Sequence, residues 1–282
     1  MNGTVSPALL DADQLPSGRE AGFGHYMLAE WTKIRSVRST VWTLVLFVII
    51  TVGLTALLTW LVVSHWNSAR APGRNATIVA DPVGFIFGAG IGLGQLTICV
   101  LGVLVISTEY STGVIRASLL AVPRRLPMLA AKAVVFAILI VILAEIVVFG
   151  SFFVGSAILH SHVHVALSDP GVTRAVVGAG LYLTVLGLFA IGVGGLIRHT
   201  AGGVSAVIGI VLVLPIITGF LPDNTWYNHI NAYVLSNAGT LVGHTVPASG
   251  DLLTAWQGFG VECIWAAVAL IGAAVLLKRR DA

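Results

Sequence analysis

The sequence predicts an all-α integral membrane protein with six transmembrane helices, an N-terminal interfacial amphipathic helix and a short cytoplasmic helix after the second span. Three observations predict this class. The chain of 282 residues is 57% hydrophobic and only 10% charged, whereas soluble globular proteins carry roughly 25% charged residues. Six apolar runs are long enough to cross a bilayer, and most basic residues lie on one side of them.

The chain divides into three expected regions. We expect residues 1–22 to form a cytoplasmic tail, 23–39 the interfacial helix, and 40–282 a single six-span membrane domain. The first 24 residues contain no apolar run of signal-peptide length, so we expect no cleaved leader. Cys99 and Cys263 lie within apolar runs, which argues against a disulfide framework.

The interfacial helix is predicted from the segment FGHYMLAEWTKIRSVRST before the first span. Its apolar positions recur at helical spacing on one face, and they are Phe23, Met27, Trp31 and Ile34. We expect Glu30 and Lys33 to lie largely on the other faces, near lipid headgroups. The alternative is that this segment is only the extended start of the first span.

The six spans follow from length, because a bilayer core of about 30 Å needs roughly 20 apolar residues in a helix. The apolar runs cover residues 40–64, 83–107, 128–160, 175–197, 203–221 and 259–277. Pro215 lies within the fifth run and should kink or loosen that helix. The overlapping G-x-x-x-G spacings of GFIFGAGIGLG, Gly84 to Gly94, predict a smooth face for close helix packing in the second span.

Charge predicts the orientation. Three of the fifteen basic residues lie on one side of the predicted membrane, and they are Arg70, Arg74 and Arg174. The other twelve lie on the opposite side, and they are Arg19, Lys33, Arg35, Arg38, Arg116, Arg124, Arg125, Lys132, Arg198, Lys278, Arg279 and Arg280. The positive-inside rule therefore predicts that both termini are cytoplasmic. We expect a multi-pass protein of the plasma membrane.

Two outward connections are long. Residues 65–82 read as a polar loop, because Pro72, Gly73 and Pro82 interrupt them. Residues 222–257 contain TWYNHINAYVLSNAGTLVG, a mixture of aromatic and apolar residues that favours an interfacial or re-entrant helical element over a free loop.

The segment EYSTGVIRASLLAVP leaves the second span on the cytoplasmic side. Ile115, Leu119 and Val122 share one helical face, and Pro123 limits the helix. This predicts a short amphipathic surface helix. The alternative is that Glu109 only marks the boundary between membrane and water.

The pattern E-Y-x-x-G-x-I-R-x-x-L, together with six spans and an N-terminal amphipathic helix, resembles the permeases of exporter-type ABC transporters, the ABC-type-two class. The resemblance implies that residues 109–125 form a coupling helix that docks onto a separate cytoplasmic ATPase subunit. The matching positions are Glu109, Tyr110, Gly113, Ile115, Arg116 and Leu119. The resemblance also implies a pair of six-span subunits, identical or different, with the substrate route between them.

This chain contains no G-x-x-x-x-G-K-[ST] motif to bind nucleotide phosphates. We therefore expect a transport subunit that is not itself an enzyme and binds no cofactor, with ATP and Mg²⁺ held by the partner ATPase. The expected partners are that ATPase, a second permease subunit and membrane lipid, and no nucleic acid. The apolar spans favour an amphipathic or hydrophobic substrate.

Glu145, Glu262 and the histidines of HSHVH are further candidates for a functional role. Glu145 lies well inside the third span, where a charge is costly, so it is a candidate for a cavity or substrate contact or a proton carrier. It could equally stay protonated and hydrogen-bond a neighbouring helix. Glu262 lies near the outer end of the sixth span, where we expect water to reach it.

The histidines of HSHVH are spaced alternately, as metal ligands could be on an extended strand, but no cysteine nearby completes a site. A solvated loop is the simpler reading of His160, His162 and His164. Two other functions remain open. One is an ion-coupled carrier that needs no ATPase, and the other, less favoured, is an intramembrane metal-dependent enzyme.

Overall fold

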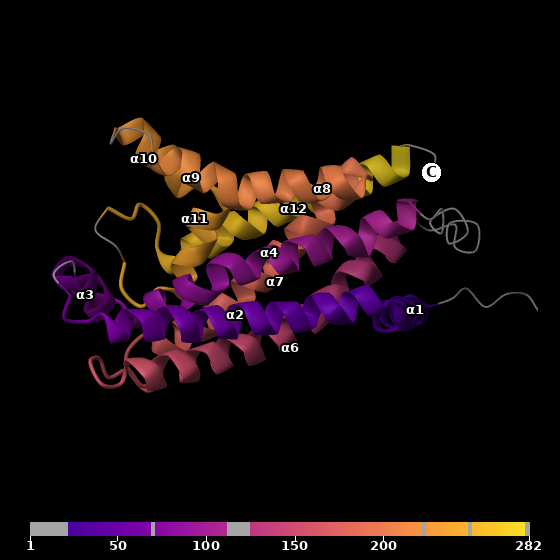
Figure 1. The fold of residues 1–282 in the computed structure, drawn as a ribbon. Helices are drawn as coiled ribbons and strands as arrows, with labels where there is room; N and C mark the ends of the chain where they lie inside the picture. Colours follow the sequence, from indigo (N-terminus) through magenta and orange to yellow (C-terminus); the bar gives the residue numbers. More distant parts are fainter. Residues whose placement is uncertain (1–21, 69–70, 112–124, 221–223, 248–249, 280–282) are drawn as a thin grey trace, which may run out of the picture.

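The computed structural model describes residues 22–68, 71–111, 125–220, 224–247 and 250–279. These residues form a bundle of long helices (Figure 1). Six helical segments are long and apolar enough to cross a membrane. They are α2 (Arg38–Ser64), α4 (Pro82–Ser111), α6 (Arg125–Leu159), α7 (Val172–Ile197), the series α8–η2–α9 (Thr200–Gly219) and α12 (Ala255–Arg279). The predicted six-span helical membrane class is therefore confirmed for the described residues.

Helix α7 is the centre of the bundle. Within its most apolar stretch 78% of the residues are buried, against 17% for α2 and for the α8–η2–α9 series. Helices α4, α6 and α12 all pack against α7. Close approach depends on glycine, because a Cβ at Gly192 would overlap the backbone of Ala269 on α12.

The glycines of α4 face in two directions. Gly90 and Gly94 lie against Thr51 and Thr55 of α2, and an added Cβ would overlap these threonines. Among the described residues, no side chain and no backbone of another element lies within 4 Å of the position that a Cβ of Gly88 would take. Gly88 lines a cavity between α4 and α7. The predicted packing face is thus confirmed for Gly90 and Gly94, whereas Gly88 lies beside open space.

The fifth span is interrupted, as Pro215 predicted. Helix α8 (Thr200–Ile208) passes into the π-helix η2 (Gly209–Val213) before α9 (Leu214–Gly219). Proline has no N–H to donate to the carbonyl four residues earlier, which is that of Val211. The hydroxyl of Ser236 donates to that carbonyl instead, at 2.8 Å. A side chain from another element therefore replaces the backbone hydrogen bond that Pro215 removes.

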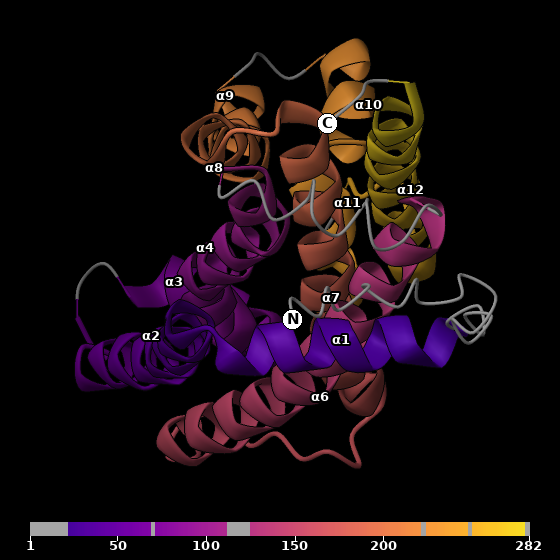
Figure 2. The same ribbon diagram turned by 90° about the vertical axis from the view of Figure 1, so that its right-hand side faces the viewer.

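Helix α1 (Phe23–Ser36) is separate from α2, because Val37 between them has an extended backbone, with φ −86° and ψ 110°. Figure 2 shows α1 lying across the end of the bundle, while α2 is seen nearly end-on. The alternative of one continuous first helix is therefore wrong. The location of α1 at a membrane surface stays a prediction.

The two ends of the bundle carry different elements. Helix α1 and the C-terminal ends of α4 and α12 lie at one end, which we call the α1 end (Figure 1). Helices α3 (Ala71–Ala80) and α10 (Thr225–Ala232) lie at the other, which we call the α3 end. The assignment of the α1 end to the cytoplasm stays a prediction, as does the division into a tail, an interfacial helix and a membrane domain.

Both long connections at the α3 end contain helices. The prediction of a plain loop at 65–82 is wrong, since α3 forms there and buries Ile78, and Asn75 donates to the carbonyl of Trp66 at 2.8 Å. The helical element expected in 222–257 is confirmed. It consists of α10, α11 (Leu235–Thr240) and the 3₁₀-helix η3 (Leu241–Gly243), and α11 packs against α12.

Candidate functional site

Four charged side chains meet at the α1 end of the bundle. Glu109 lies near the end of α4, Lys132 lies near the start of α6, and Glu30 and Lys33 lie on α1. The side chains of Glu30 and Lys132 are each 3% exposed and that of Glu109 is 10% exposed, whereas that of Lys33 is 36% exposed. We call these four residues the ion cluster.

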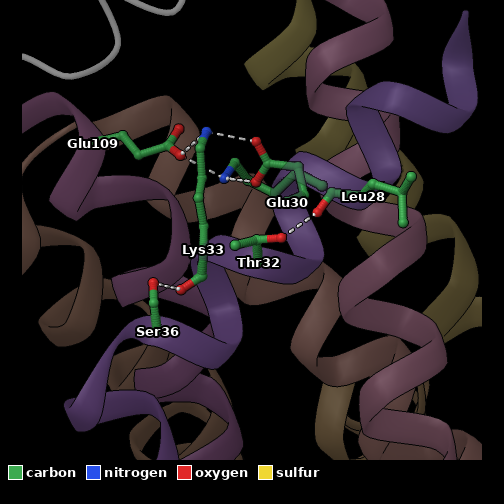
Figure 3. Close-up of polar contacts among 7 residues, drawn as sticks. Leu28, Glu30, Thr32, Lys33, Ser36 and Glu109 are labelled. Carbon is green, nitrogen blue, oxygen red and sulfur yellow. Dashed lines mark hydrogen bonds and ion pairs between the residues drawn. The ribbon is translucent and has the colours of Figure 1, made fainter.

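The cluster alternates in charge, so that each ammonium contacts both carboxylates. Lys132 Nζ lies 2.5 Å from Glu30 Oε2 and 2.8 Å from Glu109 Oε1. Lys33 Nζ lies 2.7 Å from Glu30 Oε1 and 3.0 Å from Glu109 Oε1. Figure 3 shows the carboxylates of Glu30 and Glu109 pointing toward the Lys33 ammonium. Three helices that are far apart in the sequence are thereby joined at one point.

Local helix geometry places these groups. Glu30 and Ile34 are four residues apart and are the buried residues of α1, so they share the face that packs on the bundle. Lys33 is one turn from Glu30 and reaches the cluster from the edge of that face. Lys132 follows the buried residues Met128 and Ala131 on α6, and its long aliphatic stem suits an apolar setting with the ammonium at the end.

Within the described part of the chain, the cluster is electrically balanced, with two positive and two negative groups. Buried charges are tolerated when they are paired, but removing one partner leaves an uncompensated charge that costs about 3–5 kcal/mol. Partial burial alone would lower the pKa of Lys33, but the carboxylates of Glu30 and Glu109 outweigh it, so that this pKa lies above its ordinary value. Lys33 therefore stays charged at neutral pH, and the balance is kept.

Glu109 is more than a boundary charge. The residue is 8% exposed and is paired with Lys33 and Lys132, so water does not surround it. Its expected role in coupling to an ATPase stays a prediction. Four of the residues matched by the family resemblance, Gly113, Ile115, Arg116 and Leu119, lie outside the described residues.

Tyr110, the neighbour of Glu109, contacts a second basic residue. The guanidinium carbon of Arg198 lies 5.0 Å from the centre of the Tyr110 ring, a cation–π geometry. Arg198 follows α7 with a left-handed backbone, φ 58°, and its Nη2 donates to the carbonyl of Leu276 on α12 at 2.9 Å. The α1 end is thus joined across α4, α7 and α12 as well.

The apolar stripe predicted for α1 is divided in the structure. Ile34 is buried at 7% exposure, whereas Phe23 and Trp31 are 44% and 43% exposed and Met27 is half-buried. The expectation that Glu30 lies away from the packed face is wrong, because Glu30 is 2% exposed beside Ile34. The ammonium of Lys132 on α6 is the physical reason, since it makes burial of this carboxylate possible.

A second cluster of polar side chains joins two segments at the α3 end of the bundle. Asp81 Oδ1 accepts from the backbone N–H of Gly84 at 3.0 Å, so Asp81 caps the start of α4. Its Oδ2 lies 2.8 Å from His244 Nδ1, and its Oδ1 accepts from the Thr245 hydroxyl at 2.5 Å. We call Asp81, His244 and Thr245 the Asp81 latch.

The Asp81 latch is half-open to solvent, with side-chain exposures of 16% for Asp81 and 44% for His244. Partial burial of Asp81 favours its neutral form, but the hydrogen bonds from His244, Thr245 and Gly84 outweigh it, so that the pKa of Asp81 lies below its ordinary value. The latch therefore favours a charged aspartate.

Two further carboxyl groups lie within the spans. Both oxygens of Glu145 are enclosed without a hydrogen-bond partner in the described parts of the chain, and the carboxyl group lies against Gly180 of α7. The expectation that water reaches Glu262 is wrong, because Glu262 is fully buried beside Gly239 of α11. No described residue is a hydrogen-bond partner of its oxygens. The role of Glu145 in substrate contact stays a prediction.

The histidines of the α6–α7 connection contact aromatic rings. His162 stacks near Trp66 at 4.5 Å between ring centres, and His160 lies 4.5 Å from His164. Within the described parts of the chain, no three His, Cys, Asp or Glu side chains come together as metal ligands would. The geometry of these rings thus gives no support to a metal site there.

Sequence reasoning found Glu109 but missed its partners. A signal for Lys132 exists, because a lysine inside the apolar run MLAAKAVVFAI needs an acidic partner. Nothing in the sequence says that this partner comes from Glu30, which is 102 positions away.

Comparison with known proteins adds no family assignment. No model of a known protein family matches the chain, and no curated protein matches it. The six spans and the ion cluster are accordingly the basis for any functional proposal.

Proposed function

We propose that this protein is the membrane-spanning permease subunit of an ATP-driven exporter, with ATP hydrolysed by a separate cytoplasmic subunit. The six membrane-spanning helices are compatible with a transport protein. The family resemblance around Glu109 supplies the more specific class. The observation that carries the proposal is the position of Glu109 in the ion cluster.

The cluster gives a physical route for coupling. The segment that resembles a coupling helix, residues 109–125, begins in the last residues of α4 and ends at the first residue of α6. Force applied there would therefore enter the bundle through the end of α4 and the start of α6. Glu109 links that end to α1 through Lys33 and to α6 through Lys132. A displacement of α4 would therefore be passed to α1 and α6 and not absorbed by α4 alone. The substrate would be an amphipathic or hydrophobic molecule moving between two permease subunits.

The test measures ATP-driven transport by the reconstituted pair of permease and ATPase. Glu109→Gln keeps the shape of the side chain and removes its charge, so we expect coupled transport to fall at least tenfold while the protein still inserts. Arg35→Gln is the matched control, since it removes a charge from an exposed residue of α1 at the same end of the bundle, outside both the ion cluster and residues 109–125. Coupled transport that is unchanged in Glu109→Gln would contradict the proposed route.

A second function, an ion-coupled carrier without an ATPase, is favoured by one observation. Glu145 and Glu262 are carboxyl groups inside the spans that have no hydrogen-bond partner among the residues that the structure describes. Intramembrane acids commonly bind protons or cations. Reconstitution of this chain alone under an ion gradient separates the two functions. Transport in that assay, lost in Glu145→Gln or Glu262→Gln, would favour the carrier over the ATP-driven exporter.

A further inference from the structure

A cavity of about 360 Å³ lies beside the ion cluster, between the α1–α2 junction and α4. Its polar wall includes Lys33, Glu109 and Lys132, and its apolar wall includes Ile34, Leu104 and Val105. The cavity is therefore amphipathic, with charge on one side and aliphatic side chains on the other.

The lining of the cavity changes from charged to aliphatic along the axis of the bundle. Leu104 is five residues before Glu109 on α4, which places it roughly 7.5 Å further from the α1 end at 1.5 Å per residue. Leu104 and Val105 thus lie deeper than the charged groups, whereas Ile34 lies on α1 beside Lys33. A phospholipid at the membrane surface has the same order, with its headgroup outside and its acyl chains inside.

The charges indicate which headgroup fits. Oε2 of Glu109 is buried and has no hydrogen-bond partner among the described residues, although Oε1 accepts from both lysines. A buried carboxylate oxygen without a donor is costly. The ammonium of Lys33 has three N–H groups, is partly exposed and donates to Glu30 and Glu109. The site therefore offers an acceptor for an amine and, from Lys33, a donor for a phosphate.

We propose that this cavity binds an aminophospholipid such as phosphatidylethanolamine. The amine of the headgroup donates to Glu109 Oε2, the phosphate accepts from Lys33, and one acyl chain lies along Leu104 and Val105. Among the described residues, the cluster has as many positive as negative groups, which suits a zwitterionic headgroup better than an anionic one. The inference stands apart from the proposed exporter function, because it concerns only the resting protein and its membrane.

The experiment is native mass spectrometry of the purified full chain with three lipids of identical acyl chains. Phosphatidylethanolamine has N–H donors, phosphatidylcholine has a methylated amine that cannot donate, and phosphatidylglycerol is anionic. We expect phosphatidylethanolamine to bind about tenfold more tightly than phosphatidylcholine, the ratio that one hydrogen bond to a charged group supplies. This comparison needs no variant and no ATPase.

Two variants test whether the lipid binds in this cavity. Leu104→Trp fills the apolar side of the cavity without replacing a charged residue and should abolish the preference. Leu93→Trp, the same change on an exposed part of α4, should keep it. Equal binding of phosphatidylethanolamine and phosphatidylcholine, a preference for phosphatidylglycerol, or an unchanged preference in Leu104→Trp would each overturn the proposal.

Discussion

The ion cluster and the Asp81 latch tie opposite ends of the same bundle, and both join α4 to elements far away in the sequence. They differ in burial. Lys132 and Glu30 in the ion cluster are each 3% exposed, whereas His244 in the latch is 44% exposed. Water can replace a lost partner in the latch, but it cannot do so around Lys132. The two ends should therefore respond very differently to the loss of one charge.

The largest expected effect is at Lys132. Lys132→Met keeps the length of the stem and removes the ammonium, which leaves Glu30 and Glu109 buried with less compensation. We expect the free energy of unfolding to fall by about 3–5 kcal/mol, measured by titration with a denaturing detergent in mixed micelles. A loss below about 1 kcal/mol would show that the cluster does not hold the helices together.

A smaller effect is expected at the Asp81 latch. Asp81→Asn keeps the cap of α4 but weakens the contact with His244, and we expect a loss of about 1 kcal/mol because the site is partly solvated. The same denaturation measurement checks it. A loss as large as that of Lys132→Met would remove the contrast between the two ends.

The latch also predicts a dependence on pH. The folded pKa of Asp81 is lowered, so its contribution to stability is present above the ordinary aspartate pKa of about 3.9 and is lost as pH falls through the folded value. Unfolding measured from pH 6 down to pH 3 should show this loss in the wild-type protein. Asp81→Asn should reduce the slope of the free energy of unfolding against pH. Identical slopes in both proteins would contradict the assignment of this pH dependence to Asp81.

The smallest effect is expected at Lys33, within the ion cluster itself. Its side chain is 36% exposed, so water compensates for much of its loss, and Lys33→Met should cost at most about 1 kcal/mol. Comparison with Lys132→Met tests whether burial, and not membership of the cluster, decides the energy. Equal losses in the free energy of unfolding for the two lysine variants would show that membership of the ion cluster, and not burial, decides the energy.

The sequence predicts some parts of this molecule and not others, for physical reasons. The spans could be predicted because each apolar run must be about as long as the membrane is thick. The irregular fifth span could be predicted because Pro215 lacks an N–H, but its repair by Ser236 could not, since that contact depends on how α11 packs. The burial of Glu262 was missed because its position near a span end says nothing about the neighbouring α11.

The candidate site also contains parts that the sequence predicts and parts that it does not. Glu109 could be found from a local motif, and Lys132 shows as a charge inside an apolar run. The pairing of both with Glu30 depends on α1 turning across the end of the bundle after Val37. That turn is a tertiary feature, and the helical spacing of α1 alone led to the wrong face for Glu30.

The central claim is that Glu109 and Lys132 act as one energetic unit that joins α4 to α6. A double-mutant cycle with Glu109→Gln, Lys132→Met and the combined variant measures this directly through the free energy of unfolding. We predict that the combined variant loses at least about 2 kcal/mol less than the sum of the single losses, because each single change leaves a buried charge that the second change removes. Additive losses would contradict the claim.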